Sequence, residues 1–162
     1  AMKRIPRSLI VSAAAGVFAL AASASASEAQ RAPLPPDYVE ECGSCHVAFP
    51  ARMLDAASWR AVLAGLDRHF GVDASADEKT LEPIRAYLSQ AARSRPTANG
   101  GEPLLRITET RWFRHEHDEV PARLRSGPDA VPLSNCAACH RNAAQGSYSE
   151  RSLELPAKRG SK

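Results

Sequence analysis

The chain has 162 residues, of which 44% are hydrophobic and 6% aromatic, and it carries a formal net charge of +3. A chain of this length forms one domain or two very small ones, which excludes large multidomain enzymes. With 12 prolines against 9 glycines, the composition favours short helices that are broken often.

Residues 1–26 have the pattern of a secretory signal peptide. Lys3, Arg4 and Arg7 precede an apolar stretch over residues 9–22, and small residues follow it. This stretch is shorter than the ~20 residues that a membrane-spanning helix needs. We therefore expect cleavage, export and a mature chain that does not span the membrane. That chain has 18 basic and 18 acidic residues, so the general electrostatic argument for nucleic-acid binding disappears.

Short helices are predicted before residue 93. Asp37 is placed to cap a helix that carries the first pair of cysteines. Apolar residues at helical spacing predict a helix over residues 54–69. Ser75 and Glu78 form a capping-box pattern for a further helix that ends near residue 92. Pro83 lies inside this pattern and could delay the start of that helix.

A linker and further short helices are predicted after residue 92. Residues 93–103, rich in Pro, Gly and Asn, are predicted to be a linker. A helix is expected from Thr108 to about Val120, where Pro121 follows. Ser134 is placed to cap a helix with the second pair of cysteines. Because no long stretch alternates apolar and polar residues, the predicted fold is mostly α and loop-rich.

All four cysteines belong to two CxxCH motifs, at residues 42–46 and 136–140. This is the spacing of covalent c-type haem attachment. Two thiols three positions apart reach the two vinyl groups of one porphyrin, and the next residue brings an imidazole to the iron. Disulfides would not explain a histidine after both pairs. A zinc site would need the two pairs much closer together, and a thioredoxin-like motif needs a βαβ context that the sequence lacks. The sequence therefore predicts two covalent haems, attached through Cys42, Cys45, Cys136 and Cys139, with His46 and His140 as proximal iron ligands.

The second axial ligand decides between electron transfer and the binding of small ligands. Met53, the one methionine beyond residue 26, lies too near His46 to cross easily to the opposite haem face, and we expect it to fill the core. His69 is predicted to be a distal ligand. The competing interpretation is a histidine that only caps the end of its helix.

His115 and His117 are two positions apart, so a helix directs them to nearly opposite sides. His117 shares its side with Phe113 and Val120, whereas His115 shares a charged side with Asp118. A haem-facing imidazole needs the apolar side. His117 is therefore the predicted distal ligand, with His115 as the alternative, and an open site on one iron remains the competing arrangement.

Three stretches of the chain resemble one family. The first runs from CGSCH at residues 42–46 through GLDRHFG at residues 65–71, and the second includes Trp112 and His117. The third runs from CAACH at residues 136–140 to Leu155 and Pro156. Together they resemble the small bacterial dihaem cytochromes c, called DHC, over about residues 34–156.

This resemblance implies a small cytochrome c-like helical fold wrapped around two covalent haems. A haem segment over residues 34–92 and another over residues 104–156 would flank the linker within a domain spanning residues 27–162. The resemblance further implies two bis-histidine irons, with His69 and His117 as distal ligands, and a non-enzymatic role in periplasmic electron transfer. By analogy, a membrane b-type cytochrome and a small oxygen-binding monohaem cytochrome are expected redox partners.

Two other functions compete with this interpretation. The first is a dihaem electron-donor subunit of a periplasmic reductase, although such subunits usually carry their motifs closer together. The second is a haem enzyme or gas binder with one open iron site. Dihaem peroxidases are about twice this size, and the spare histidines make an open site unnecessary.

Overall fold

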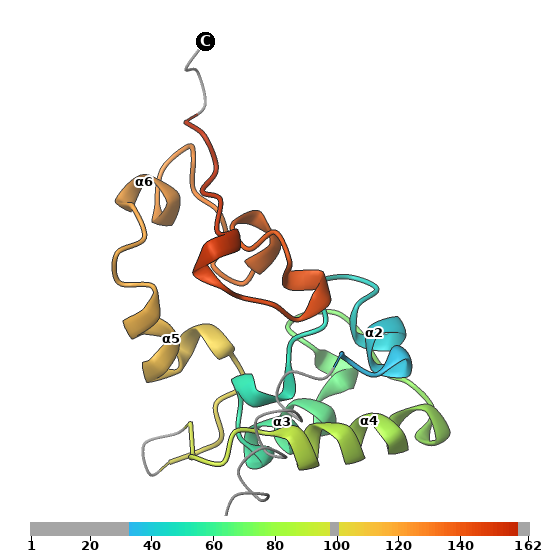
Figure 1. Cartoon of the computed structure of the whole chain (residues 1–162). Coiled ribbons are helices and arrows are strands. Elements are labelled where there is room, and N and C mark those ends of the chain that lie inside the picture. Colours follow the sequence, from blue (N-terminus) through green and yellow to red (C-terminus); the bar gives the residue numbers. More distant parts are fainter. Residues whose placement is uncertain (1–32, 98–100, 159–162) are drawn as a thin grey trace, which may run out of the picture. The chain divides into compact units, whose positions relative to one another are not determined.

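The computed structural model describes residues 33–97 and 101–158, drawn in colour in Figure 1. The predicted signal peptide lies outside the described residues, as do positions 98–100 of the predicted linker. Within the described part the chain is helical and forms no strand, which confirms the mostly α, loop-rich prediction. None of the helices described has the length and apolar character to cross a membrane.

Five α-helices connected by loops and single 3-10 turns make up the described regular structure (Figure 1). They are α2 (Pro36–Cys42), α3 (Ala56–Ala64), α4 (Glu78–Ala91), α5 (Arg111–Glu116) and α6 (Ala122–Arg125). Helix α4 packs against both α2 and α3.

Helix α2 begins two residues earlier than predicted, at Pro36. Pro35 occupies the position before it and Pro36 the first turn, where the missing N–H removes no helical hydrogen bond. Asp37 therefore lies inside the first turn, and the prediction that it caps the helix is wrong. The helix ends at Cys42, so only the first cysteine of the motif is helical.

The predicted helix over residues 54–69 is shorter in the structure. The Asp55 carboxylate accepts a hydrogen bond from Ser58 N at 2.8 Å, which starts α3 at Ala56. Gly65 ends the helix, and residues 66–68 then form a 3-10 turn that leads to His69. His69 consequently follows a turn instead of ending a helix.

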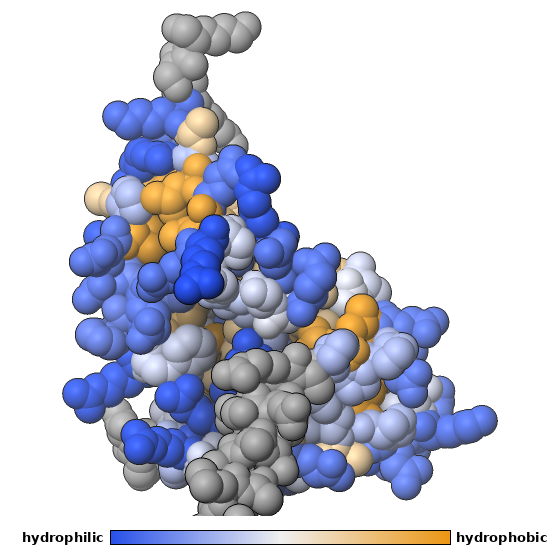
Figure 2. Space-filling view, in the orientation of Figure 1, coloured by the Kyte–Doolittle hydropathy of each residue, from blue (hydrophilic) through white to orange (hydrophobic). Residues whose placement is uncertain are grey.

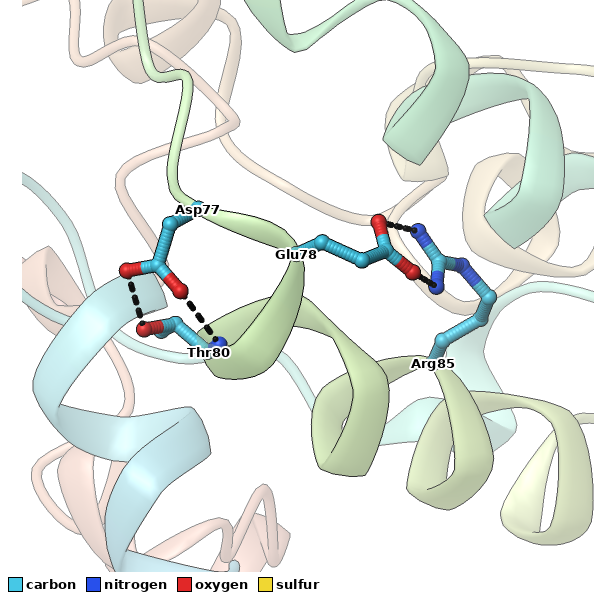
Figure 3. A network of polar contacts seen from close by, with 4 residues as sticks. All are labelled: Asp77, Glu78, Thr80 and Arg85. Atoms are coloured by element: carbon cyan, nitrogen blue, oxygen red, sulfur yellow. Dashed lines mark hydrogen bonds and ion pairs between the residues drawn. The ribbon is translucent and has the colours of Figure 1, made fainter.

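Asp77, not Ser75, caps α4. Its carboxylate accepts from Thr80 N at 3.0 Å and from the Thr80 hydroxyl at 2.8 Å, as Figure 3 shows. Pro83 lies within the helix without delaying its start. Since Lys79 and Pro83 are both exposed, water can reach the Lys79 carbonyl that loses its usual N–H partner.

Figure 3 also shows an ion pair that links two turns of α4. Arg85 donates to Glu78 at 2.6 Å and 3.2 Å, one bond to each carboxylate oxygen. Because both side chains are largely exposed, the pair contributes little to stability.

The main apolar core lies in the N-terminal segment, residues 33–97. Tyr38 and Trp59 are buried and each donates a hydrogen bond to a backbone carbonyl, that of Phe49 and that of Ala51, both at 2.6 Å. Between residues 101 and 158, only Thr110, Phe113, Leu124 and Ala143 are buried. The core cluster consists of Tyr38, Ala48, Ala51, Leu54, Trp59, Ile84 and Leu88.

The start of the predicted linker is anchored to the N-terminus of α3. The Asp55 carboxylate accepts from Thr97 N at 2.6 Å and from the Thr97 hydroxyl at 2.7 Å. Arg93 N donates to Leu54 O at 2.9 Å. Burial alone would raise the pKa of Asp55, but the hydrogen bonds from Thr97 and Ser58 outweigh it and lower this pKa to about 2. The Asp55 carboxylate thus caps α3 and binds Thr97, while the Leu54 carbonyl holds Arg93.

We expect Asp55→Asn to destabilise the protein at neutral pH by about 1–2 kcal/mol. A carboxyl with a lowered pKa stabilises the folded state above its unfolded pKa of about 3.9, and this contribution is lost as the pH falls towards 2. Urea unfolding at pH 7 and at pH 3 should therefore show a smaller difference between variant and wild type at pH 3. A difference that stays constant with pH would contradict the assignment.

Candidate functional site

The first CxxCH motif lies where α2 ends. Cys42 is the last helical residue and half-buried, while Cys45 and His46 follow it and are exposed. Gly43 N donates to Val39 O at 2.9 Å, which closes the last turn of the helix. A Cβ at Gly43 would lie 2.2 Å from that same oxygen, so the first position between these cysteines has room for glycine only.

The second motif has a different backbone. Cys136 opens a 3-10 turn (Cys136–Ala138), and His140 N donates to Cys136 O at 2.8 Å. Asn135 occupies the cap position without a side-chain hydrogen bond, so the prediction that Ser134 caps an α-helix here is wrong. The C-terminal residues fold back over the motif: Glu154 N donates to Cys139 O at 2.8 Å, and Arg141 forms an ion pair with Glu154.

The histidine of each CxxCH motif faces a histidine from a distant segment. The ring centroids of His46 and His69 are 6.3 Å apart, and those of His117 and His140 are 6.2 Å apart. An imidazole nitrogen lies about 2 Å from a metal that it ligates and about 1 Å from its own ring centre, so two imidazoles across one metal have centroids about 6 Å apart. Both pairs have the spacing of two axial ligands.

In His46 and His117, a hydrogen bond determines which ring nitrogen is free to bind a metal. His117 Nδ1 lies 2.9 Å from Phe113 O, and His46 Nδ1 lies 2.8 Å from Val47 O. A carbonyl oxygen can only accept, so Nδ1 carries the proton in both rings. Nε2 is then left with a lone pair for a metal.

The structure distinguishes between His115 and His117, the two candidates for the second distal ligand. His117 follows the helix as its C-cap residue, is partly buried, and stacks on Phe113 with ring centroids 3.8 Å apart. His115 is exposed and does not line the cavity beside the second motif. The predicted helix over residues 108–120 is shorter, because Thr110 caps α5 and the helix ends at Glu116.

A cavity of about 550 Å³ lies beside the second motif, which is within the size range of cofactor sites. His117 and His140 both line it, together with Cys136 and Cys139. On the side of the molecule shown in Figure 2, apolar side chains gather near α6 and the C-terminal residues. Several exposed leucines also line the cavity, namely Leu133, Leu153 and Leu155.

The surroundings of His69, His140 and Cys42 favour the uncharged form of each side chain. Burial is the main cause of the lowered pKa of His69, and His46 and Arg106 lower this pKa further. Burial likewise lowers the pKa of His140, with a smaller contribution from His117. Burial raises the pKa of the Cys42 thiol to about 11. Neutral imidazole is the form that binds a metal, and no disulfide joins any of the four cysteines.

Sequence reasoning missed two contributors to the cavity. Met53 is buried as expected, but it also lines the cavity, and Trp112 Nε1 donates to its carbonyl at 3.3 Å. Tyr148 packs against His140 with ring centroids 5.3 Å apart. Proximity to the motif in sequence could have pointed to Tyr148, whereas no local pattern places Met53 there.

The chain matches the family model of the dihaem cytochromes c, DHC, over residues 38–148. The chain belongs to the DHC family. This confirms the resemblance seen in the sequence and the prediction of two c-type haems. A DHC is a cytochrome of the electron-transfer type.

Two solved structures are similar to this DHC. A dihaem cytochrome c from Shewanella baltica OS155 is 38% identical, with a TM-score of 0.65 over 76% of this chain and 95% of that one. A DHC purified from Rhodobacter sphaeroides is 41% identical, with a TM-score of 0.60 over 70% of this chain and 96% of that one. Among curated proteins, no match is found.

The residues of this DHC fit the two haems that its family implies. Each CxxCH motif supplies two thiols for attachment and a histidine that faces a second imidazole at the spacing of two axial ligands. In the second site the ring nitrogen Nδ1 of His140 is buried without a partner among the described residues. The apolar wall of the cavity suits a porphyrin ring.

We expect Gly43→Ala to impair the first haem site, because the added methyl collides with the Val39 carbonyl. Overpacking of this kind typically costs about 1–3 kcal/mol. Haem content per chain, measured from the alkaline pyridine spectrum, should fall together with the unfolding temperature. Gly65→Ala is the matched control, since a Cβ there would lie 3.8 Å from the nearest oxygen. Equal haem content in both variants would contradict the steric argument.

Proposed function

We propose that this DHC is a periplasmic electron-transfer protein in which both haem irons have two histidine ligands. His46 and His69 would ligate one iron, and His140 and His117 the other. The spacing of the two imidazole pairs carries this proposal, because 6.3 Å and 6.2 Å match the ~6 Å expected between the centroids of two imidazoles that ligate one metal from opposite sides.

When bound, each haem supplies a one-electron iron couple. Histidines in both axial positions would leave no place for a substrate or a gas at the iron. The Phe113 and Val47 carbonyls hold the rings of His117 and His46 in one tautomer. Ligands held in this way keep their positions in both oxidation states, so little rearrangement accompanies electron transfer.

The two sites differ in their surroundings, which supports different potentials for the two haems. His46 is exposed and stacks on Phe49, with ring centroids 4.8 Å apart, whereas His140 is partly buried beside the apolar cavity. Burial and the local charge set the potential of a haem. A difference in potential would give the flow of electrons a direction.

The expected export of the chain supports the periplasm as its location. Its proposed partners are other redox proteins, among them a membrane b-type cytochrome as donor and a small oxygen-binding monohaem cytochrome. These two follow from the resemblance of the sequence to DHC and not from a surface of this chain.

Replacing a distal ligand should open one iron. We expect the oxidised wild-type protein to lack a high-spin absorption band and the reduced protein to bind no carbon monoxide. His69→Ala and His117→Ala should each make one haem high-spin and able to bind carbon monoxide. His115→Ala is the matched control and should resemble the wild type. A high-spin band in the wild type, or loss of low-spin character in His115→Ala, would contradict the ligand assignment.

The orientation of the ligand rings should be visible by electron paramagnetic resonance. The planes of His46 and His69 are 28° apart, and those of His117 and His140 are 66° apart. Near-parallel imidazoles split the iron d orbitals more than crossed ones do. We therefore expect two distinct low-spin signals from the oxidised protein, the more anisotropic one lost in His117→Ala. Two identical signals would contradict the described ring geometry.

A further inference from the structure

His69 lacks the hydrogen bond that orients two of the other proposed ligands. Backbone carbonyls accept from Nδ1 of His46 and of His117, which determines how those rings are turned. Within residues 33–97 and 101–158, no hydrogen bond joins the ring of His69 to another residue. Its ring instead contacts that of Phe70, with centroids 4.8 Å apart and planes 62° apart, in the edge-on arrangement common among aromatic rings. The orientation of His69 therefore depends on what holds Phe70.

Phe70 occupies a turn position that does not suit its side chain. Val72 N donates to His69 O at 3.1 Å, which closes a tight turn with Phe70 and Gly71 as its central residues. Their φ angles are +50° and +102°. Turns of this kind favour Asn or Asp followed by Gly, because a bulky side chain is strained at positive φ. Among the described residues other than glycine, Phe70 alone has a positive φ. A phenyl ring is thus kept where the backbone favours a small polar residue.

A contact from beyond the predicted linker holds the Phe70 ring. Burial does not explain this phenylalanine, since it is 48% exposed. The Arg106 guanidinium carbon, however, lies 4.0 Å from the centroid of its ring, which is the geometry of a cation–π contact. Glu109 Oε1 lies 3.8 Å from Arg106 Nε and also restricts the arginine side chain. The phenyl ring thus contacts both the guanidinium of Arg106 and the imidazole of His69.

A second arginine near His69 provides a comparison. Arg68 directly precedes His69 in the chain, and its side chain is 83% exposed. Its guanidinium forms an ion pair with Asp67 at 3.3 Å, which contributes little at so exposed a site. Positive charge next to His69 is thus supplied by Arg68 as well, whereas the guanidinium over the Phe70 ring is that of Arg106.

We propose that Arg106 is a positioning residue for His69 and acts through Phe70. The guanidinium holds the phenyl ring in place at the strained turn, and the phenyl ring limits rotation of the adjacent imidazole. His69 is thereby kept in the orientation in which it faces His46. This inference rests on the proposed ligation of one iron by His46 and His69. It gives the second half of the chain a task at the first site, because Arg106 follows the predicted linker and both histidines precede it.

Cyanide binding to the oxidised holoprotein measures how firmly His69 is held. Cyanide can bind an iron that has two histidine ligands only after the distal histidine dissociates. Electron paramagnetic resonance follows the low-spin signal of the first haem, which is identified as the signal that His69→Ala loses. We expect Arg106→Gln to accelerate cyanide binding at this haem about 2- to 5-fold, the range that corresponds to one exposed cation–π contact.

Phe70→Asn distinguishes positioning from a general effect on stability. Asparagine suits the positive φ of this turn but has no ring on which the guanidinium could stack. We therefore expect cyanide to bind the first haem at least as fast as in Arg106→Gln, while the unfolding temperature stays at or above that of the wild type. A phenyl ring with a purely structural role would instead lower the unfolding temperature when it is removed.

Arg68→Gln is the matched control, because it removes a positive charge beside His69 and leaves the stack of Arg106 on Phe70 in place. The second haem is a control within each molecule. Faster binding confined to the first haem, in both Arg106→Gln and Phe70→Asn, supports the proposal. A wild-type rate in either variant, an equal acceleration in Arg68→Gln or at the second haem, or a lowered unfolding temperature in Phe70→Asn would overturn it.

These outcomes are separable from those of the ligand assignment. A failure of the proposed function appears in the wild-type protein, as a high-spin iron or as carbon monoxide binding, or in His69→Ala, as two unchanged low-spin signals. A failure of the positioning role appears only in the cyanide-binding rates and unfolding temperatures of variants whose wild-type parent has two low-spin haems.

Discussion

The proposed ligation of each iron by two imidazoles imposes the main constraint on this chain. The partners lie in separate segments, 46 with 69 and 117 with 140, so each pair requires the backbone to turn back on itself. Gly65 and the 3-10 turn that follows return the chain to the first motif. The short α5, which ends at Glu116, leaves His117 at a helix end where its ring can turn towards the second motif.

The same five-residue motif is presented on two different backbones. In the first, α2 ends at Cys42, and a carbonyl excludes any side chain at Gly43. In the second, a 3-10 turn carries Cys136, and an alanine occupies the position equivalent to Gly43. The covalent chemistry demands the spacing of the thiols and the histidine, and it leaves the surrounding structure free to differ.

The sequence was most informative where chemistry restricts the residue types. Two CxxCH motifs predicted the haems, and helical periodicity placed His117 on the apolar side, where the structure brings it to His140. The helix boundaries were less predictable. Asp37 and Ser134 were suitable cap residues, but Pro36 and the 3-10 turn at Cys136 placed the helix starts elsewhere.

Contacts between distant residues account for most of the remaining differences. Asp55 starts α3 and at the same time binds Thr97, a partner that no local pattern reveals. The packing of the loop at Gly146 on Leu34 was equally hidden, because residues 34 and 146 share no period or motif.

The uneven distribution of buried side chains has a consequence for how the protein folds. Residues 33–97 bury tyrosine, tryptophan and leucine side chains against one another, whereas residues 101–158 mostly surround a cavity. The first segment has an apolar core of its own and can collapse early. A porphyrin in the cavity would supply the second segment with the apolar surface that its own side chains lack. We therefore expect haem attachment to add more to the stability of residues 101–158 than to that of residues 33–97.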